Sequence, residues 1–278
     1  MSTDNDFSLE TFYDAYPRIE AEFQAALDTS LQPRGPGLLY DLVSTLGLLR
    51  GASVIDTGCG EGNHSLELAS RFGVSVHGID PVPRHIELAN RQLAEAATRQ
   101  PELRNLVHFE MGTVEAIPAE DVSCDLVWCR DVLSHVAQLD QAYASCRRVL
   151  RNNGHMLVYQ TFGTEHLEPR EASRLWATMK VVPQSTQPEY TEAAIAKAGL
   201  CIDRCLELSS EWGEWAEEHT GQGSRQLLHA ARLLRSPEQY RAQFGSAAYE
   251  IMLGDCLWHV YRMIGKLSPR IYLLSRVP

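Results

Sequence analysis

The sequence predicts an α/β fold in which a mostly parallel sheet carries helices on both faces. Short apolar segments alternate with longer helical ones through the middle of the chain, a pattern typical of such sheets. The first apolar segment, 52–56, runs into a turn that contains Gly58 and Gly60. The next one, 74–79, ends in Asp80, 20 residues after Gly60. Both features fall beyond the carboxyl ends of strands, where a doubly wound sheet binds its ligands.

The remaining elements follow in chain order from apolar periodicity and turn residues. The predicted helices are 8–29, 38–49, 63–72, 82–98, 139–150 and 189–198, and the predicted strands are 52–56, 74–79, 106–111, 124–129, 154–160, 201–208 and 270–274. The segment 211–265 is mostly helical and rich in aromatic residues. It is too long for a plain connection between two strands, so we expect an inserted helical cap.

Bulk properties exclude several classes of protein. The 278 residues carry a formal net charge of −11, whereas non-specific binding to nucleic acid requires basic patches. No apolar run has the length of a membrane span, and the first residues lack the basic and apolar regions of a signal peptide. We therefore expect a cytoplasmic protein without a nucleic-acid or membrane partner. The sequence leaves open whether it is a monomer or a homodimer.

Cysteine and histidine spacing predicts no metal site. The seven cysteines are odd in number and scattered, which in a cytosolic chain indicates reduced and mostly buried thiols. No pair has the C-x-x-C spacing of zinc sites, and the ten histidines include no H-E-x-x-H. The sequence by itself therefore gives no support for a bound metal ion.

The segment Val54–Asn63, which reads V-I-D-T-G-C-G-E-G-N, carries the most specific motif. D-x-G-x-G at the end of a first strand, followed by a second strand that ends in an acid, resembles the class I S-adenosylmethionine (SAM) dependent methyltransferases. Asn63 replaces the third glycine of a dinucleotide fingerprint, which disfavours an oxidoreductase. A plain glycine-rich turn is the alternative interpretation of this segment.

The resemblance implies a set of cofactor-binding residues. In that family the glycine turn packs against the methionine part of SAM, because glycine lets the backbone bend sharply and the ligand approach closely. The acid of the second strand holds the ribose hydroxyls. The residues concerned in this chain are Asp56, Gly58, Gly60, Asn63, Asp80 and Pro81.

The third strand leads into Met111–Pro118, which resembles the loop that borders the adenine in this family. Thr113 stands where the first acid of the family motif is expected, so this position lacks the carboxylate that the motif places beside the adenine amine. Val114 would present its backbone N–H to the ring, and Glu115 would structure the loop. An ordinary surface turn is the alternative.

The fourth strand lies in Cys124–Val136, which also resembles a family segment. The resemblance places the backbone of Arg130 against the methionine part of SAM. It places His135 near the transferred methyl group, where it would act as a base or close the pocket; a purely structural histidine is the alternative. A later segment, Arg147–Val158, resembles the family's helix–turn–strand signature and supports the fold rather than the chemistry.

Residues for the acceptor lie outside these motifs. Glu165 and Glu168 follow the fifth strand and are candidate bases or ligands for a cationic acceptor, with solvated carboxylates as the alternative. N-terminal helices of relatives fold over SAM as a lid, and aromatic residues of the cap favour a flat or cationic molecule. The candidate substrate contacts are Tyr13, Tyr16, His166, Trp212 and Trp258.

The resemblance, which covers about residues 40–165, implies a Rossmann-like, doubly wound sheet of seven strands with the last strand antiparallel. The expected divisions are an N-terminal helical lid at 1–50, a SAM-binding α/β core at 51–210, a helical cap at 211–268 and the final core strand at 269–278. We expect methyl transfer from SAM to O, N or C of a small molecule, as in the sugar, natural-product and quinone groups, with S-adenosylhomocysteine as product. The alternatives are a SAM-binding relative that catalyses a non-methyl step and a non-catalytic scaffold.

Overall fold

The computed structural model describes residues 8–276, which divide into two units at Pro33. The first unit contains one helix, α1 (Leu9–Leu27), which confirms the helix predicted over 8–29. Ser8 caps this helix, because its Oγ accepts a hydrogen bond from the backbone N–H of Thr11 at 3.1 Å. The second unit, from Arg34 onward, contains all the other elements.

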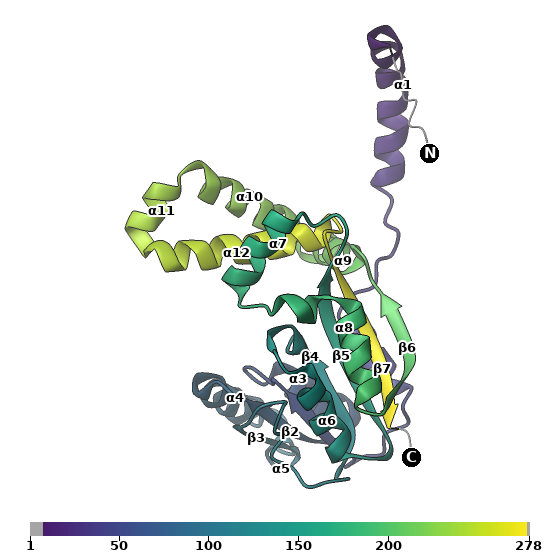
Figure 1. Ribbon diagram of the computed structural model, residues 1–278, viewed down its shortest axis with the longest axis vertical. Coiled ribbons are helices and arrows are strands. Elements are labelled where there is room, and N and C mark those ends of the chain that lie inside the picture. The colour runs from purple at the N-terminus through teal and green to yellow at the C-terminus, as the bar shows by residue number, and fades with distance from the viewer. Residues whose placement is uncertain (1–7, 277–278) are drawn as a thin grey trace. The chain divides into compact units, whose positions relative to one another are not determined.

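The second unit is built on a seven-stranded sheet in the order β3-β2-β1-β4-β5-β7-β6 (Figure 1). Strands β1 to β5 pair in parallel, whereas β7 lies antiparallel between β5 and β6. The prediction of a mostly parallel sheet with an antiparallel last strand is therefore confirmed. The strands are β1 (Ser53–Thr57), β2 (Ser75–Asp80), β3 (Val107–Met111), β4 (Cys124–Arg130), β5 (Leu150–Gly163), β6 (Leu200–Glu207) and β7 (Leu267–Arg276).

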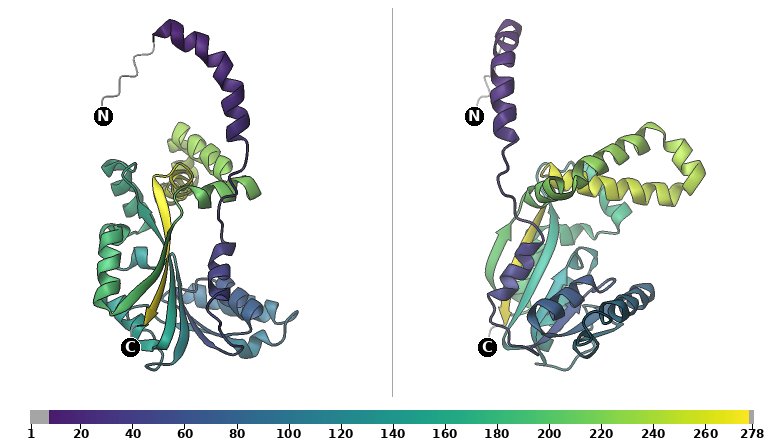
Figure 2. Two further views of the ribbon diagram at one scale, coloured as in Figure 1. Left: turned by 90° about the vertical axis from the view of Figure 1, so that its right-hand side faces the viewer. Right: turned by 180° about the vertical axis from the view of Figure 1, so that it is seen from behind.

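Two layers of helices cover the sheet, because alternate side chains of each strand point to opposite faces. One face packs against α2 (Gly37–Ser44), α3 (Asn63–Phe72), α4 (Pro83–Ala96) and α5 (Leu103–Leu106), around the fully buried Trp128. The other face packs against α6 (Leu139–Val149) and α8 (Pro188–Lys197), around Tyr143 and Tyr272. The left view of Figure 2 shows these two layers on either side of the sheet.

Some elements differ from the prediction. The helix predicted over 38–49 ends at Ser44, and a turn with Gly47 at φ 65° follows. A helix that the sequence analysis did not predict, α7 (Pro169–Met179), begins with proline at its first position and a capping box between Glu168 and Glu171. The short 3₁₀ helices η1 (Leu133–His135) and η2 (Pro183–Thr186) were likewise not predicted.

The aromatic segment after β6 forms four helices rather than one continuous stretch. Gly221, the Ser236–Pro237 pair and Gly245 interrupt it, because each disfavours continuation of a helix. The helices are α9 (Glu211–Thr220), α10 (Gln222–Arg235), α11 (Pro237–Phe244) and α12 (Ser246–Met263). Helices α10 and α12 lie side by side, joined by α11, and extend sideways from the end of the sheet (Figures 1 and 2).

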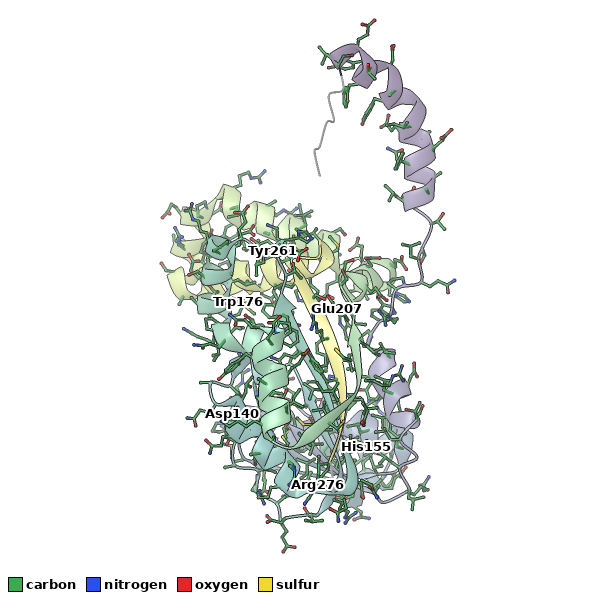
Figure 3. All side chains as sticks on the ribbon, turned by 45° about the vertical axis from the view of Figure 1, so that its right-hand side comes forward. Asp140, His155, Trp176, Glu207, Tyr261 and Arg276 are labelled. Atoms are coloured by element: carbon green, nitrogen blue, oxygen red, sulfur yellow. The ribbon has the colours of Figure 1, made fainter. Side chains whose placement is uncertain are left out.

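Helix α9 and the last turns of α12 lie at the carboxyl ends of the parallel strands. Trp176 and Tyr261 lie toward this end of the sheet in Figure 3, whereas His155 and Arg276 lie toward the opposite end. This arrangement places the aromatic helices beside the edge where ligands of doubly wound sheets bind. Within residues 8–276, no helix combines the length and the apolar character needed to cross a membrane.

Candidate active site

The turn after β1 requires glycine at position 58. Gly58 has φ 68°, and its backbone N–H and that of Cys59 both donate to the carbonyl oxygen of Ile79, at 2.7 and 2.9 Å. A Cβ atom on Gly58 would lie 2.2 Å from Cγ2 of Val132. The turn is therefore held against the end of β2 and packed by the segment that follows β4, with no room for a side chain.

Asp80, at the end of β2, is fixed by hydrogen bonds from three directions. Its Oδ2 accepts from the backbone N–H of Gly60 at 3.0 Å, and its Oδ1 accepts from the backbone N–H of Val82 at 2.9 Å. His85 Nδ1 lies 3.0 Å from the same Oδ1. Only 5% of Asp80 is exposed, yet a carboxylate has about four lone-pair sites. The carboxylate can therefore still accept hydrogen bonds from a diol, and the exposed Pro81 follows it.

Asp56 supports the turn from inside the protein. It is 2% exposed, and its Oδ2 accepts a hydrogen bond from Ser65 Oγ at 2.5 Å. Burial raises the pKa of Asp56 to about 7, and the nearby charge of Asp80 adds to this effect. Asn63, which begins α3, is exposed. Asp56 is thus a buried structural carboxyl group below the turn.

The loop after β3 joins the turn on its other side. The backbone N–H of Gly112 donates to the carbonyl oxygen of Asp80 at 3.2 Å, and Thr113 and Ala116 form an isolated bridge. The side chain of Val114 is buried beside Ile79, whereas Thr113 is exposed. The loop is therefore anchored by Val114 next to the end of β2. We call the turn at 58–60, Asp80 and the loop 112–114 the cofactor crevice.

Arg130, at the end of β4, connects this crevice with the helices above it. Its Nη1 donates to Nε2 of His64, so Nδ1 of His64 carries the proton and donates to Tyr40 Oη at 2.7 Å. Burial, and next the charge of Arg130, lowers the pKa of His64 to about 4. The guanidinium also lies 5.6 Å from the ring centre of Tyr159 and 6.0 Å from that of Trp212.

A cavity of about 430 Å³ opens beside Arg130, and we call it the acceptor pocket. It lies between the end of β4 with η1, the end of α7, and the helices α9 and α12. Its lining combines three tryptophans with cationic, acidic and imidazole groups. The residues are Pro36, Arg130, Asp131, Ser134, His135, Met179, Val181, Trp212, Trp215, Ala216, Gln222, Asp255, Trp258, His259 and Arg262.

Arg262 is the most deeply buried cation of this pocket, with 8% of its surface exposed. Its Nη2 lies 3.1 Å from Nδ1 of His259. Its Nε atom is buried and has no hydrogen-bond partner within residues 8–276, and the same holds for Nε of Arg130. The pocket therefore contains guanidinium N–H donors that the protein leaves unused.

Comparison with known proteins agrees with this geometry. Residues 55–158 match the family model described as "Methyltransferase domain". Residues 55–158 therefore form a methyltransferase domain. Ubiquinone biosynthesis O-methyltransferase of Methylocella silvestris is 33% identical over 110 residues, which are 40% of this chain and 40% of that protein. The chain spans about half or less of the length of the first curated relatives that it matches.

Solved structures share the fold of this methyltransferase domain. Geranyl diphosphate C-methyltransferase of Streptomyces coelicolor has a TM-score of 0.62 at 15% identity, and the match covers 99% of this chain and 86% of that one. The [4+2]-cyclase SpnF has a TM-score of 0.66 at 19% identity, with 95% and 94% covered. At these identities the likeness shows the fold alone.

Of the proposed catalytic residues of the methyltransferase domain, one lines the pocket. His135 is exposed at the rim, and its Nδ1 donates to the carbonyl oxygen of Lys180 at 3.0 Å, which leaves Nε2 as a free acceptor. Glu168 caps α7, and the side chain of Glu165 is 88% exposed, with His166 beside it at 4.0 Å. These last three residues are not part of the pocket lining.

The proposed substrate contacts also separate into groups. Trp212 lines the pocket, is 3% exposed and packs on Tyr159 with ring centres 4.6 Å apart. Trp258 lines it as well and meets Trp176 edge to face at 6.0 Å. The other two, Tyr13 and Tyr16, are exposed on α1 in the first unit. Their role as a lid stays a prediction.

Sequence reasoning missed several pocket residues, chiefly Asp255, His259 and Arg262. They lie four and three residues apart along α12, so one face of the helix presents all three. That spacing could have indicated from the sequence that the three side chains share one face of a helix. Trp215, whose ring packs where a side chain on Gly35 would lie, also lines the pocket.

Proposed function

We propose that the protein transfers the methyl group of SAM to a small molecule held in the acceptor pocket. The proposal rests mainly on one short segment that serves both the cofactor crevice and the pocket. Val132 packs on Gly58 of the turn, and its neighbours Arg130, Asp131 and Ser134 line the pocket. A molecule in the pocket would therefore lie beside the methionine end of the crevice.

The residues of the crevice fit SAM. The carboxylate of Asp80 faces the position of the ribose with acceptor capacity to spare, and Gly58 and Gly60 keep the turn free of side chains. When bound, SAM supplies an electrophilic methyl group on a sulfonium and becomes S-adenosylhomocysteine after the transfer. The protein needs to place the acceptor atom in line with that methyl group and keep water away.

Pocket residues perform this task in two ways. The walls formed by Trp212, Trp215 and Trp258 exclude water and hold a flat molecule. His135 Nδ1 donates to the carbonyl oxygen of Lys180, so Nε2 keeps its lone pair and accepts the proton that a hydroxyl acceptor releases as its oxygen attacks. We propose His135, the last residue of η1, as this base, since it is the exposed imidazole of the pocket lining.

The unused donors of Arg130 and Arg262 favour an anionic acceptor. A buried N–H donor without a hydrogen-bond partner, such as the Nε of Arg130 or Arg262, is costly in the folded protein, and a ligand oxygen with negative charge offsets that cost through a charge-assisted hydrogen bond. Together with the tryptophan walls, this favours a hydroxylated aromatic carboxylate over an amine. The pocket also contains two carboxylates, and each has a basic neighbour at 3.9 Å. Asp131 lies beside Arg130, and Asp255 lies beside His259.

The test is a transfer assay with a matched set of acceptors. S-adenosylhomocysteine formation is measured by mass spectrometry with a dihydroxybenzoate, with neutral catechol and with an aromatic amine. We expect the carboxylate to react best and R262M to raise its KM about tenfold or more, with the Kd for SAM unchanged. R232M, which removes an exposed arginine of α10, serves as control. Equal use of catechol and carboxylate by the wild type would contradict the acceptor class but not the methyl transfer.

A second candidate is a reaction in which SAM stays intact, and the fold shared with a [4+2]-cyclase supports its consideration. A non-catalytic scaffold is the third. The same assay separates them: a cyclase-like protein would convert an acceptor without forming S-adenosylhomocysteine, and a scaffold would convert nothing. The intact glycine turn, with the pocket beside it, favours an enzyme over a scaffold, and the assay separates methyl transfer from the cyclase-like reaction.

We also propose that the protein works in the cytoplasm and not on nucleic acid. The net charge of −11 opposes binding to phosphates. The seven cysteines are all free and five of them are buried, which suits a reducing compartment. A gel-shift assay with duplex DNA and RNA at low salt tests the second point, and tight binding there would contradict it.

A further inference from the structure

Three side chains that could bind a metal ion, His77, His108 and Glu110, lie close together at the edge of the sheet. His77 on β2 pairs in register with His108 on the edge strand β3. Glu110 lies two residues beyond His108, so its side chain points to the same face of the sheet. Among residues 8–276, this is the one group of three such side chains whose ligand atoms come together, all within 4.8 Å of one another.

The opposite face of these strands explains why the three polar side chains gather here. Val76, Val107 and Phe109 alternate with them and are buried under α3, α4 and α5. The polar residues consequently occupy the other face, where His108 is exposed. A cation from solvent can therefore reach the cluster without any rearrangement of the core.

The local contacts of His77 leave its Nε2 atom without a hydrogen-bond partner in the described part of the chain. His77 Nε2 lies 2.7 Å from Glu110 Oε1, but the contact is not aligned as a hydrogen bond, and the nitrogen is buried without another partner in the described part of the chain. An imidazole nitrogen and a carboxylate oxygen are therefore close together without a hydrogen bond between them, and both are ligand atoms that a metal ion accepts.

We propose that His77, His108 and Glu110 bind a divalent transition-metal ion, with Zn²⁺ as the favoured occupant. Two imidazoles and one carboxylate are a common zinc ligand set, and the fourth position of a tetrahedral site is left to water. The same set also accepts Ni²⁺, Cu²⁺ and Co²⁺. The site is separate from the acceptor pocket and does not depend on the proposed methyl transfer.

A bound ion would connect the edge strand to its neighbour close to the cofactor crevice. Asp80 lies three residues after His77 on β2, and Gly112, whose N–H donates to the carbonyl oxygen of Asp80, lies two residues after Glu110. Fixing β3 to β2 therefore stabilises the two strand ends that hold the ribose acid and the loop 112–114. We expect metal loading to raise the midpoint of thermal unfolding and to strengthen SAM binding slightly.

The experiment uses the full chain without a polyhistidine tag, freed of metal by dialysis against a chelator. Zn²⁺ is titrated in a non-coordinating buffer by calorimetry, and thermal unfolding is followed with and without Zn²⁺. We expect one ion per chain, and affinities weakened about 10–100-fold or more in H108A and E110Q. Both positions are partly or fully exposed, so the variants should fold. H166A, which removes an exposed histidine outside the cluster, is the matched control.

Co²⁺ absorption distinguishes this site from the exposed thiols. Ligation by Cys201 or Cys205, the two exposed cysteines, would give an intense sulfur-to-metal charge-transfer band, which imidazole and carboxylate ligands do not produce. We expect weak d–d bands alone, unchanged in C201S and C205S and lost in H108A. The proposal would be overturned if the wild type did not bind one ion per chain, or if H108A bound the ion as tightly as the wild type. A thiolate charge-transfer band with Co²⁺ would also overturn it.

Discussion

The cofactor crevice and the acceptor pocket are built on different principles, although they share the segment after β4. The crevice is formed by residues near each other in sequence, and most of its hydrogen bonds involve backbone groups, such as Gly60 N–H to Asp80. The pocket collects side chains from η1, α7, α9 and α12. Crevice geometry is therefore a property of strand ends and turns, whereas pocket chemistry depends on how helices far apart in the chain pack.

This difference leads to a general expectation about mutations. Changes in the crevice should affect stability and SAM binding, because the same bonds shape the turn and the binding surface. Changes at the rim of the pocket should affect turnover and leave the fold intact. A crevice variant with normal stability and SAM affinity, or a rim variant that fails to fold, would contradict this expectation.

The largest effect is expected for Gly58→Ala. The new methyl group would add about 1–2 kcal/mol of backbone strain at φ 68° and about 1–3 kcal/mol from the clash with Val132. Gly60→Ala is the matched control, because Gly60 also has a positive φ, 54°, but has nothing within 4 Å of a new Cβ. Urea unfolding should show a loss at least twice as large for Gly58→Ala. Equal losses in the two variants would mean that Val132 yields without resistance.

Asp56 is expected to make stability depend on pH. Its folded-state pKa is raised from 3.8 to about 7 by burial, so the native protein holds a proton that the unfolded chain releases above about pH 4. The stability from this neutral carboxyl group is complete below pH 3.8 and is lost as the pH rises through about 7.

Asp56→Asn stays neutral at every pH. Its free energy of unfolding relative to the wild type should therefore rise between pH 4 and pH 7, by an amount on the order of a few kcal/mol, and stay level above. Urea unfolding of both proteins at pH 5 and pH 8 measures this difference. Asp125→Asn, which alters a partly exposed carboxylate outside the crevice, is the comparison. A difference that does not change with pH would show that Asp56 is ionised in the folded protein.

Asp80→Ala is expected to weaken SAM binding by about 1.5–3 kcal/mol, because a charged hydrogen-bond acceptor to two hydroxyls is lost. The backbone N–H groups of Gly60 and Val82 also lose their partner, so some destabilisation should accompany the loss. Calorimetric titration with S-adenosylhomocysteine measures the affinity. An unchanged Kd would exclude the crevice as the ribose site.

The crevice could be predicted from the sequence because its determinants are local. A glycine forced to positive φ and an acid at a strand end leave a signature within 30 residues, as Gly58 and Asp80 do. The pocket could be predicted only in part: Trp212 and Trp258 were named, but Arg262 and Arg130 line the same pocket only through the packing of α12. Likewise, His77 and His108 are brought together by strand register alone, and no sequence spacing indicates that pairing. The start of α7 was missed although Glu168 and Glu171 carry a recognisable capping box.

The smallest effect on the fold is expected for His135→Asn, which tests whether a change at the rim of the acceptor pocket affects turnover alone. The side chain is exposed and its one internal bond, to the carbonyl oxygen of Lys180, can be kept by the asparagine amide. Stability and SAM affinity should therefore match the wild type, while turnover of a hydroxyl acceptor should fall about tenfold, or 1.4 kcal/mol in the barrier. Solvent access at the rim limits the loss, since water can take over part of the proton transfer.

The pH profile decides whether His135 acts as a base or only shapes the rim. With His135 as the base, the pH dependence of wild-type turnover includes the ionisation of this one side chain, so the profile should change in His135→Asn. Glu165→Gln and Glu168→Gln are the comparisons, because they remove the carboxylates that are the alternative bases. Since Glu168 caps α7 and Glu165 lies in solvent, both variants should keep the wild-type profile. A tenfold loss in either one, with SAM affinity retained, would instead assign the base to the loop after β5 and require that loop to move toward the pocket.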